Sequence, residues 1–338
     1  MLNTRTFLLL TSIIMAVFFF ASCKERNRFY IAEFEQETKV NIKRFDLDFI
    51  RLDTADIAKG LKALDVKYPD FFVLYFLNGL GLDPADYDGN ALLVKDFLTN
   101  KQFINVHREV EKVLSNTSPF EKQINKAYNY LRHYFPEIRL PDIYFFVSGF
   151  NHQFLITDSI IGVGSDVYLG SDFKPYQELT YEYLIPNMRP EMLVPELLNE
   201  VLRHHFTFSG ELNLLNAMIH EGKIMYLLSV LLPESGANLL MGYSDEQVQW
   251  CNQNASQVWT RILENKDLFS TDQLLITQYI QVAPFTSPVS QESPGRLGVW
   301  TGWKIVKSYM QNNKNIDLSQ LMKNTQYQKI LEKSGYKP

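Results

Sequence analysis

The sequence predicts an α+β fold that is mostly helical, with a small mixed or antiparallel sheet covered by helices. Short apolar runs at Asp142–Gly149, Gln153–Thr157 and Ile160–Val163 predict strands. A two-residue polar turn between the last two runs predicts a hairpin. The predicted order is a strand, several helices, a meander of strands and two long helices, which suits an α+β fold with helices on one face of the sheet.

The start of the chain, residues 1–22, predicts a lipoprotein signal peptide. Phe7–Ala21 is mostly apolar, Arg5 is the only charged side chain, and the run is too short for a comfortable membrane span. Small residues precede Cys23, which resembles a bacterial lipobox and implies cleavage before Cys23 and acylation of its thiol. The alternative is an ordinary signal peptide followed by a chance cysteine.

After the leader, residues 23–34 are expected to form a tether and residues 35–338 a single α+β domain that is helical from about residue 235. The net charge of −5 and the lack of a basic run argue against nucleic acid as a partner. Cys251 is the only other cysteine, so no internal disulfide is expected.

The first elements of the domain are a predicted strand and a predicted helix. Val40–Ile50 alternates between apolar and polar residues, which predicts a strand with one bulge and with Asp46 and Asp48 facing solvent. Ile57–Asn78 predicts a helix that Pro69 interrupts.

Two amphipathic helices are predicted next, at Phe103–Leu114 and Phe120–Tyr134. They carry His107 and His133, each of which we expect at the surface or half-buried rather than as a metal ligand.

The C-terminal part is predicted to be helical. Ser244–Gln247 is a capping box, and it predicts a helix that runs to about Glu264. A short helix follows at Thr271–Gln281, and the last long helix lies within Ser293–Met310. Gly298 and Gly302 are four residues apart there, so we expect another backbone to approach closely.

The two central helices, Leu193–His205 and Leu212–Leu232, pose the functional question. A thermolysin-type zinc peptidase carries His-Glu-x-x-His on one helix and a Glu about twenty residues later on a second. In this chain Glu221 stands where that later Glu would be.

The first helix fits the zinc motif in two registers, and both lack the histidines. Asn199-Glu200-x-x-Arg203 occupies the motif in one register, and Pro195-Glu196-x-x-Asn199 in the other. Each keeps the Glu. Asn is a weak neutral ligand and Arg a permanent cation, so we expect no tightly bound zinc and no catalytic residue.

Two interpretations of these positions remain open. Glu200 and His204 are also four residues apart, and with Glu196 one turn earlier and Glu221 they would form a Glu/His/Glu site. Alternatively, Glu196, Glu200 and Arg203 form exposed pairs along the helix. Glu221 would then accept a hydrogen bond from Arg203 or from a tyrosine.

Several segments carry a resemblance to a known family: Ile161–Gly170, Ile219–Tyr226, Leu231–Glu234, Met241–Ser244 and Ser293–Met310. Together with the lipobox they resemble the gliding-motility lipoprotein GldB family. The resemblance implies an outer-envelope lipoprotein of a Gram-negative cell, associated with gliding and the type IX secretion apparatus. It also implies a gluzincin-like peptidase fold whose metal motif is often eroded.

Three functions are therefore weighed. The first is a non-catalytic binding or assembly component, anchored in the outer membrane through Cys23, without cofactor and with unidentified envelope protein partners. The second is an atypical zinc metallopeptidase that uses Glu200, His204 and Glu221. The third is a peptide or glycan binder with its cleft between an edge strand at Ile160–Tyr168 and the Leu193–His205 helix.

Overall fold

The computed structural model describes residues 28–34 and 38–338. The predicted signal peptide and Cys23 lie outside these ranges. The chain divides into two units, Met1–Glu33 and Phe34–Pro338, and the second contains the elements described below. Within the described residues, no helix combines the length and the apolar character needed to cross a membrane.

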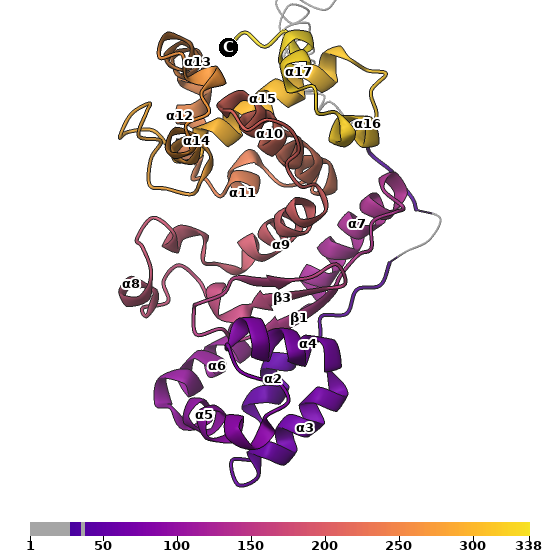
Figure 1. The fold of residues 1–338 in the computed structure, drawn as a ribbon, viewed down its shortest axis with the longest axis vertical. Coiled ribbons are helices and arrows are strands. Elements are labelled where there is room, and N and C mark those ends of the chain that lie inside the picture. The colour runs from indigo at the N-terminus through magenta and orange to yellow at the C-terminus, as the bar shows by residue number, and fades with distance from the viewer. Residues whose placement is uncertain (1–27, 35–37) are drawn as a thin grey trace, which may run out of the picture. The chain divides into compact units, whose positions relative to one another are not determined.

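The second unit is mostly helical, with one small sheet (Figure 1). The elements up to the sheet are α2 (Phe45–Ile50), α3 (Ile57–Lys67), α4 (Pro69–Leu74), the π-helix η1 (Tyr75–Gly79), α5 (Tyr87–Thr99), α6 (Lys101–Val113) and α7 (Ser118–Tyr134). The strands are β1 (Asp142–Phe146), β2 (Phe154–Ile156) and β3 (Ile160–Gly164). The elements from the sheet to the central pair are η2 (Ser165–Val167), α8 (Tyr176–Leu179), η3 (Ile185–Asn187), α9 (Pro190–His205) and α10 (Leu214–Leu231). The last elements are α11 (Ala237–Met241), α12 (Asp245–Gln253), α13 (Ala255–Glu264), η4 (Asp267–Phe269), α14 (Gln273–Ile280), α15 (Leu297–Asn312), α16 (Leu318–Lys323) and α17 (Tyr327–Ser334).

The sheet is mixed and has the strand order β1-β3-β2. Strand β1 pairs with β3 in parallel, with Asp142 opposite Ile160, and β2 pairs with β3 as the predicted antiparallel hairpin. The three predicted strands are confirmed, but the predicted meander is wrong, because β1 pairs in parallel with β3 rather than with its sequence neighbour β2. The third hypothesis placed an edge strand at Ile160–Tyr168, which is wrong, because β3 is central and β2 is the edge strand that contacts α9.

The predicted strand at Val40–Ile50 is wrong. Only Lys43 bridges to the sheet, opposite Tyr144, and the chain then enters α2. Phe45 and Phe49 lie one helical turn apart and are 1% and 2% exposed, so helical rather than alternating spacing buries both rings.

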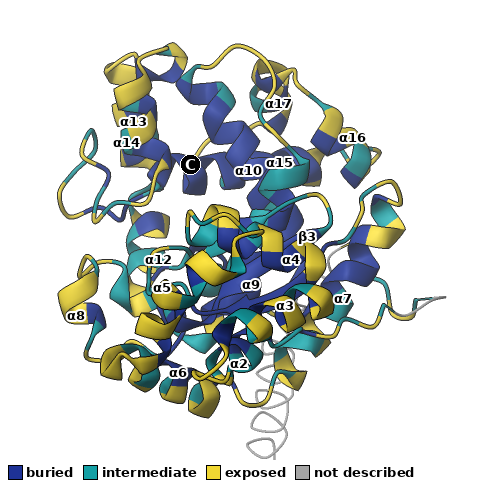
Figure 2. Ribbon diagram, turned by 60° about the horizontal axis from the view of Figure 1, so that its bottom comes forward, coloured by how far each residue is buried: buried dark blue, intermediate teal, exposed yellow. Residues whose placement is uncertain are grey.

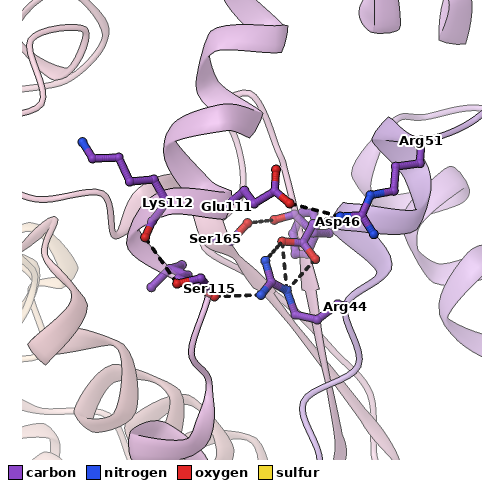
Figure 3. A network of polar contacts seen from close by, with 9 residues as sticks. Arg44, Asp46, Arg51, Glu111, Lys112, Ser115 and Ser165 are labelled. Atoms are coloured by element: carbon purple, nitrogen blue, oxygen red, sulfur yellow. Dashed lines mark hydrogen bonds and ion pairs between the residues drawn. The ribbon is translucent and has the colours of Figure 1, made fainter.

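Asp46 on α2 is buried, although the sequence placed it in solvent. Arg44 holds it through Nε and Nη2, at 2.9 Å and 2.8 Å, and donates from Nη1 to the Leu114 carbonyl at 2.7 Å (Figure 3). A buried carboxylate is tolerated where such a partner neutralises it. Burial still raises the pKa of Asp46 above its ordinary value.

An aromatic core joins helices α2–α5 to one face of the sheet. The Phe71 ring stacks on Tyr144 with centroids 4.4 Å apart, and Phe45 packs edge-on against Phe71 at 5.0 Å. Tyr75 contacts Phe45 and the strand residue Phe146 at 5.1 Å and 5.5 Å. The dense aromatic stripe of the predicted Ile57–Asn78 helix is thus the contact surface for the sheet, and α7 and α9 lie across the sheet from it (Figure 1).

The C-terminal half is organised around α10, which is buried along most of its length (Figure 2). Buried residues lie on every side of α10, as in a helix surrounded by protein. Helix α15 packs on it through glycines: a Cβ at Gly302 would lie 1.7 Å from the Met218 carbonyl oxygen, and one at Gly222 2.3 Å from the Gly302 carbonyl carbon. The predicted close approach of another backbone is confirmed at both glycines, since a Cβ at Gly298 would lie 2.9 Å from the Tyr279 carbonyl oxygen on α14.

Two further predictions, one in each half, need smaller changes. The capping box at Ser244 is confirmed, but the helix it opens breaks at Asn254 into α12 and α13. His107 on α6, expected at or near the surface, is 3% exposed, and neither ring nitrogen has a hydrogen-bond partner among the described residues.

Candidate functional site

Helix α9 carries the candidate residues on one stripe. Pro190 begins the helix, where its fixed φ is favourable. Glu196, Asn199 and Arg203 follow at spacings of three and four residues, so they share one face. The rest of the helix is anchored by buried apolar residues, among them Leu193, Leu197, Leu198, Val201 and Leu202.

A charged pair connects this stripe to α10. Arg203 Nη1 donates to Glu221 Oε1 at 2.8 Å, and Nη2 donates to Oε2, so the pair is bidentate. The side chain of Glu221 is 9% exposed and that of Arg203 33%. The predicted contact between Arg203 and Glu221 is confirmed, and it occupies both oxygens of the carboxylate that would serve as the third zinc ligand.

Glu196 is held from the side of the sheet. Its Oε2 accepts from the Tyr168 hydroxyl at 2.8 Å and from Gln153 Nε2 at 2.5 Å. Burial removes solvent from the carboxylate and raises its pKa to about 7, although the donors from Tyr168 and the charge of Arg296 act in the opposite direction. Oε1 accepts no hydrogen bond from the described residues.

The same face of α9 lines a cleft of about 680 Å³. Its polar lining includes Glu196 and Asn199 of α9, Arg189 before α9, Arg296 before α15 and Gln153 before β2. Asn199 Oδ1 is buried and accepts no hydrogen bond from the described residues. Flexible apolar side chains complete the lining, among them Leu184, Met188, Met192, Leu240, Met241 and Val282.

Arg296 reaches this cleft from an unusual backbone position. It precedes α15 with φ 61°, in the left-handed region that is uncommon for a residue with a side chain. Nη1 donates to the Met241 carbonyl at 3.3 Å, and no carboxylate among the described residues lies within 4.0 Å of the guanidinium. Burial lowers the pKa of Arg296, and the charge of Arg203 acts in the same direction, whereas the charges of Glu221 and Glu196 raise it.

The alternative zinc site at Glu200, His204 and Glu221 is not brought together. His204 Nε2 lies 2.8 Å from Asp158 Oδ1 in the β2–β3 turn, and Glu221 is bound by Arg203. Within residues 28–34 and 38–338, no three His, Cys, Asp or Glu side chains are grouped to hold a metal ion. The donors on α9 also fit zinc poorly, since Arg203 is a permanent cation.

The second interpretation, of exposed pairs along α9, is wrong as well. Glu196, Glu200 and Arg203 are all half-buried. The side chains of Glu196 and Arg203 bond to other elements, and the side chain of Glu200 forms no hydrogen bond or ion pair with the described residues.

The opposite side of α10 has a structural role. Lys223 is 2% exposed and donates to the carbonyls of Met322 and Asn324 at 3.0 Å each, so it holds the end of α16. Burial lowers its pKa to about 8, and burial lowers the pKa of His220, which packs edge-on against Phe208, to about 4.

Sequence reasoning missed four residues of the site: Gln153, Asp158, Tyr168 and Arg296. Each belongs to a loop, a turn or a helix end that is distant from α9 along the chain. Arg296 lies within the Ser293–Met310 run but had no local feature that marked it. A non-glycine residue with positive φ is visible only in the structure.

The comparisons with known proteins give one match. The family model described as gliding motility protein GldB matches residues 27–338, nearly the whole chain. No curated protein and no solved structure matches.

Proposed function

The chain belongs to the family of gliding motility protein GldB, and we propose on this basis that it is a non-catalytic binding or assembly component of an envelope machine. The family makes it a gliding-motility lipoprotein associated with the cell envelope. The proposal adds that its role is to bind and assemble rather than to cleave, within the motility or type IX secretion machinery.

One observation carries the proposal: the bidentate pair between Arg203 and Glu221. Metal-assisted hydrolysis needs a cation held by three protein ligands and a carboxylate free to take a proton from bound water. Here a guanidinium occupies both oxygens of Glu221, and its permanent charge opposes a dication beside it. The pair instead joins α9 to α10.

The same proposal includes an evolutionary origin of the fold from a metallopeptidase. The helix pair α9–α10, with β2 as edge strand beside α9, supports a gluzincin-like architecture in which an ion pair has replaced the metal. The Glu of each motif register survives, as Glu196 and Glu200, but the two imidazole positions are Asn199 and Arg203 or Pro195 and Asn199.

The anchor is part of the proposal too. Acylated Cys23 would attach the chain to the outer membrane, since the short apolar leader ends in small residues before that cysteine. Cys23→Ala is expected to release the protein from the membrane fraction. If that variant sediments with outer membranes as fully as the parent does, the anchor lies elsewhere.

The absence of catalysis is tested by metal content and by complementation. Protein purified without chelators should contain far less than one equivalent of zinc by elemental analysis and should not cleave a mixture of unfolded polypeptides. About one equivalent of zinc, lost in Glu221→Ala, would overturn the proposal in favour of a metallopeptidase.

A complementation assay tests the same point in the cell. A deletion strain that carries the double variant Glu200→Gln, His204→Asn should glide as well as one that carries the parent. Loss of gliding with a folded, correctly fractionated double variant would also contradict a non-catalytic role.

A further inference from the structure

The lining of the cleft beside α9 carries two guanidinium groups, those of Arg189 and Arg296, and one carboxylate, that of Glu196. Arg296 has no carboxylate among the described residues within 4.0 Å, and Arg189 reaches Glu191 only at 3.6 Å while donating from Nε to the Pro186 carbonyl. Glu196 is the cleft's carboxylate, and Tyr168 and Gln153 already use its Oε2. Two guanidinium groups therefore face the cleft with donors to spare, and the N-terminus of α15 adds a partial positive charge.

The floor of the same cleft offers acceptors. Glu196 Oε1 accepts no hydrogen bond from the described residues. Asn199 Oδ1 accepts none either and is fully buried, so it meets a ligand only when the Asn199 amide turns over. A buried acceptor without a donor is costly, so a ligand that brings N–H groups gains from meeting it. A purely anionic ligand such as sulfate would bring no donor and would face the carboxylate of Glu196.

The remaining lining suits side chains. Met188, Met192 and Met241 supply flexible apolar surface that adapts to different shapes. At the mouth, Tyr183 stacks on Tyr181 with centroids 5.7 Å apart, and Tyr181 is 71% exposed. Exposed tyrosines beside guanidinium groups are typical of surfaces that bind protein.

We propose, resting on the binding role above, that this cleft binds an extended protein segment and that Arg296 and Arg189 hold a carboxylate of that segment. The acceptors on α9 take backbone N–H groups, and the methionine-rich wall takes side chains. A volume of about 680 Å³ suits a few residues rather than a folded domain. The carboxylate is either the end of the chain or an acidic side chain.

The probes are three pools of synthetic hexapeptides with randomised uncharged residues. The first pool ends in a free carboxylate, the second is amidated and carries one internal Glu, and the third is amidated and has no acid. The full-length lipoprotein in detergent is immobilised, and the retained peptides are quantified by mass spectrometry. We expect the first pool, the second or both to be retained at least about tenfold over the third.

Variants of Arg296 test whether the preference for acid-bearing peptides depends on this side chain. Arg296→Asn removes the charge with a residue that tolerates the left-handed backbone, and Arg296→Lys keeps the charge. We expect Asn to lose the preference for acid-bearing pools and Lys to retain part of it, with both melting within a few degrees of the parent. Arg132→Gln, on the exposed surface of α7, is the matched control and should retain the preference.

The outcomes separate this inference from the proposed function. Equal retention of all three pools, no retention of any pool, or an unchanged preference in Arg296→Asn would overturn the carboxylate site. Should Arg296→Asn fail to fold, Arg189→Gln together with Tyr183→Ala decides the same point at the cleft's outer wall. None of these results bears on zinc content or cleavage, which test the non-catalytic role.

Discussion

The two halves of the domain pack their elements differently: large aromatic side chains fill the N-terminal half, whereas glycines allow direct backbone contact in the C-terminal half. In the N-terminal half, rings fill the space between α2–α5 and the sheet, as in the stack of Phe71 on Tyr144 at 4.4 Å. In the C-terminal half, α10 and α15 meet where Gly222 and Gly302 remove the side chains, so that backbone touches backbone. A side chain can change its rotamer when a neighbour is substituted. Two backbones in contact can relieve a clash only if a whole helix moves.

This difference has a consequence for the site. Helix α10, held by α15, carries Glu221, and α9 between the sheet and α10 carries Arg203. The ion pair and the cleft therefore depend on the rigid glycine interface on one side and on the sheet on the other. We expect comparable substitutions in the two halves to change the free energy of unfolding by different amounts. Four substitutions, each with a control, measure this difference.

The largest effect is expected from Gly302→Leu. A Cβ there would lie 1.7 Å from the Met218 carbonyl oxygen, far inside contact distance, so α10 and α15 must separate. The sequence alone suggested an overpacking cost of about 1–3 kcal/mol. With backbone as the obstacle, we expect a loss of more than about 5 kcal/mol in the free energy of unfolding, measured by chemical denaturation.

Gly60→Leu on α3 is the matched control. A Cβ at Gly60 would lie 2.7 Å from the end of the Leu52 side chain, which can rotate away. The control should cost far less than Gly302→Leu. Similar losses for the two variants would contradict the distinction between backbone and side-chain contacts.

The next effect should come from Phe71→Ala in the aromatic core. Phe71 is fully buried and contacts Phe45, Tyr75 and Tyr144. Removing it leaves a cavity, and such changes cost about 3–5 kcal/mol. Leu fills part of the space, and the surrounding rings can close much of the rest. Phe71→Leu should therefore lose less than half as much stability as Phe71→Ala. A folded protein with equal losses for Ala and Leu would show that this core does not adapt.

His107 in the N-terminal half should make stability depend on pH. Burial lowers its pKa to about 4 from 6.5, so the folded state disfavours the charged ring. The stability contributed by the neutral ring is present above pH 6.5 and is lost as the pH falls from 6.5 to 4. The total is roughly 3 kcal/mol.

The test compares the parent with His107→Leu by denaturation at several pH values. The stability of the variant relative to the parent should rise steadily as the pH falls below 6.5. Above pH 7 the difference in stability should be constant. His133→Leu, where the replaced ring is exposed, controls for the loss of a histidine. A difference that stays the same from pH 8 to pH 4 would remove the argument.

The smallest effect should come from Arg203→Ala. The pair with Glu221 is only partly buried, because a third of the Arg203 side chain is exposed, so we expect a loss of about 1–3 kcal/mol. Arg51→Ala breaks an exposed pair with Glu111, with side chains 61% and 58% exposed, and should cost about 0–1 kcal/mol. A loss for Arg203→Ala no greater than for Arg51→Ala would mean that the pair does not hold α9 to α10.

Local chemistry explains which parts of the fold were predictable. The β2–β3 hairpin depends on the Asp158-Ser159 turn, α12 on the capping box at Ser244, and the break before α4 on Pro69. Each signal lies within a few residues of the structure it determines. The contact between Arg203 and Glu221 was also predictable, because two helices in sequence joined by a short turn bring a limited set of positions together.

What the sequence by itself determined is the family, the three strands, the central helix pair and the absence of histidine from the zinc-motif positions of α9. Only the tertiary structure decided that Phe45–Ile50 is a helix, that Asp46 is buried and that Arg296 lines the same cleft as Glu196 and Asn199. These features result from segments far apart in the chain, whose packing energies exceed the local preferences of any one of them. A residue such as Arg296 adopts a left-handed backbone because the surrounding structure requires it, and no neighbour in the sequence records that requirement.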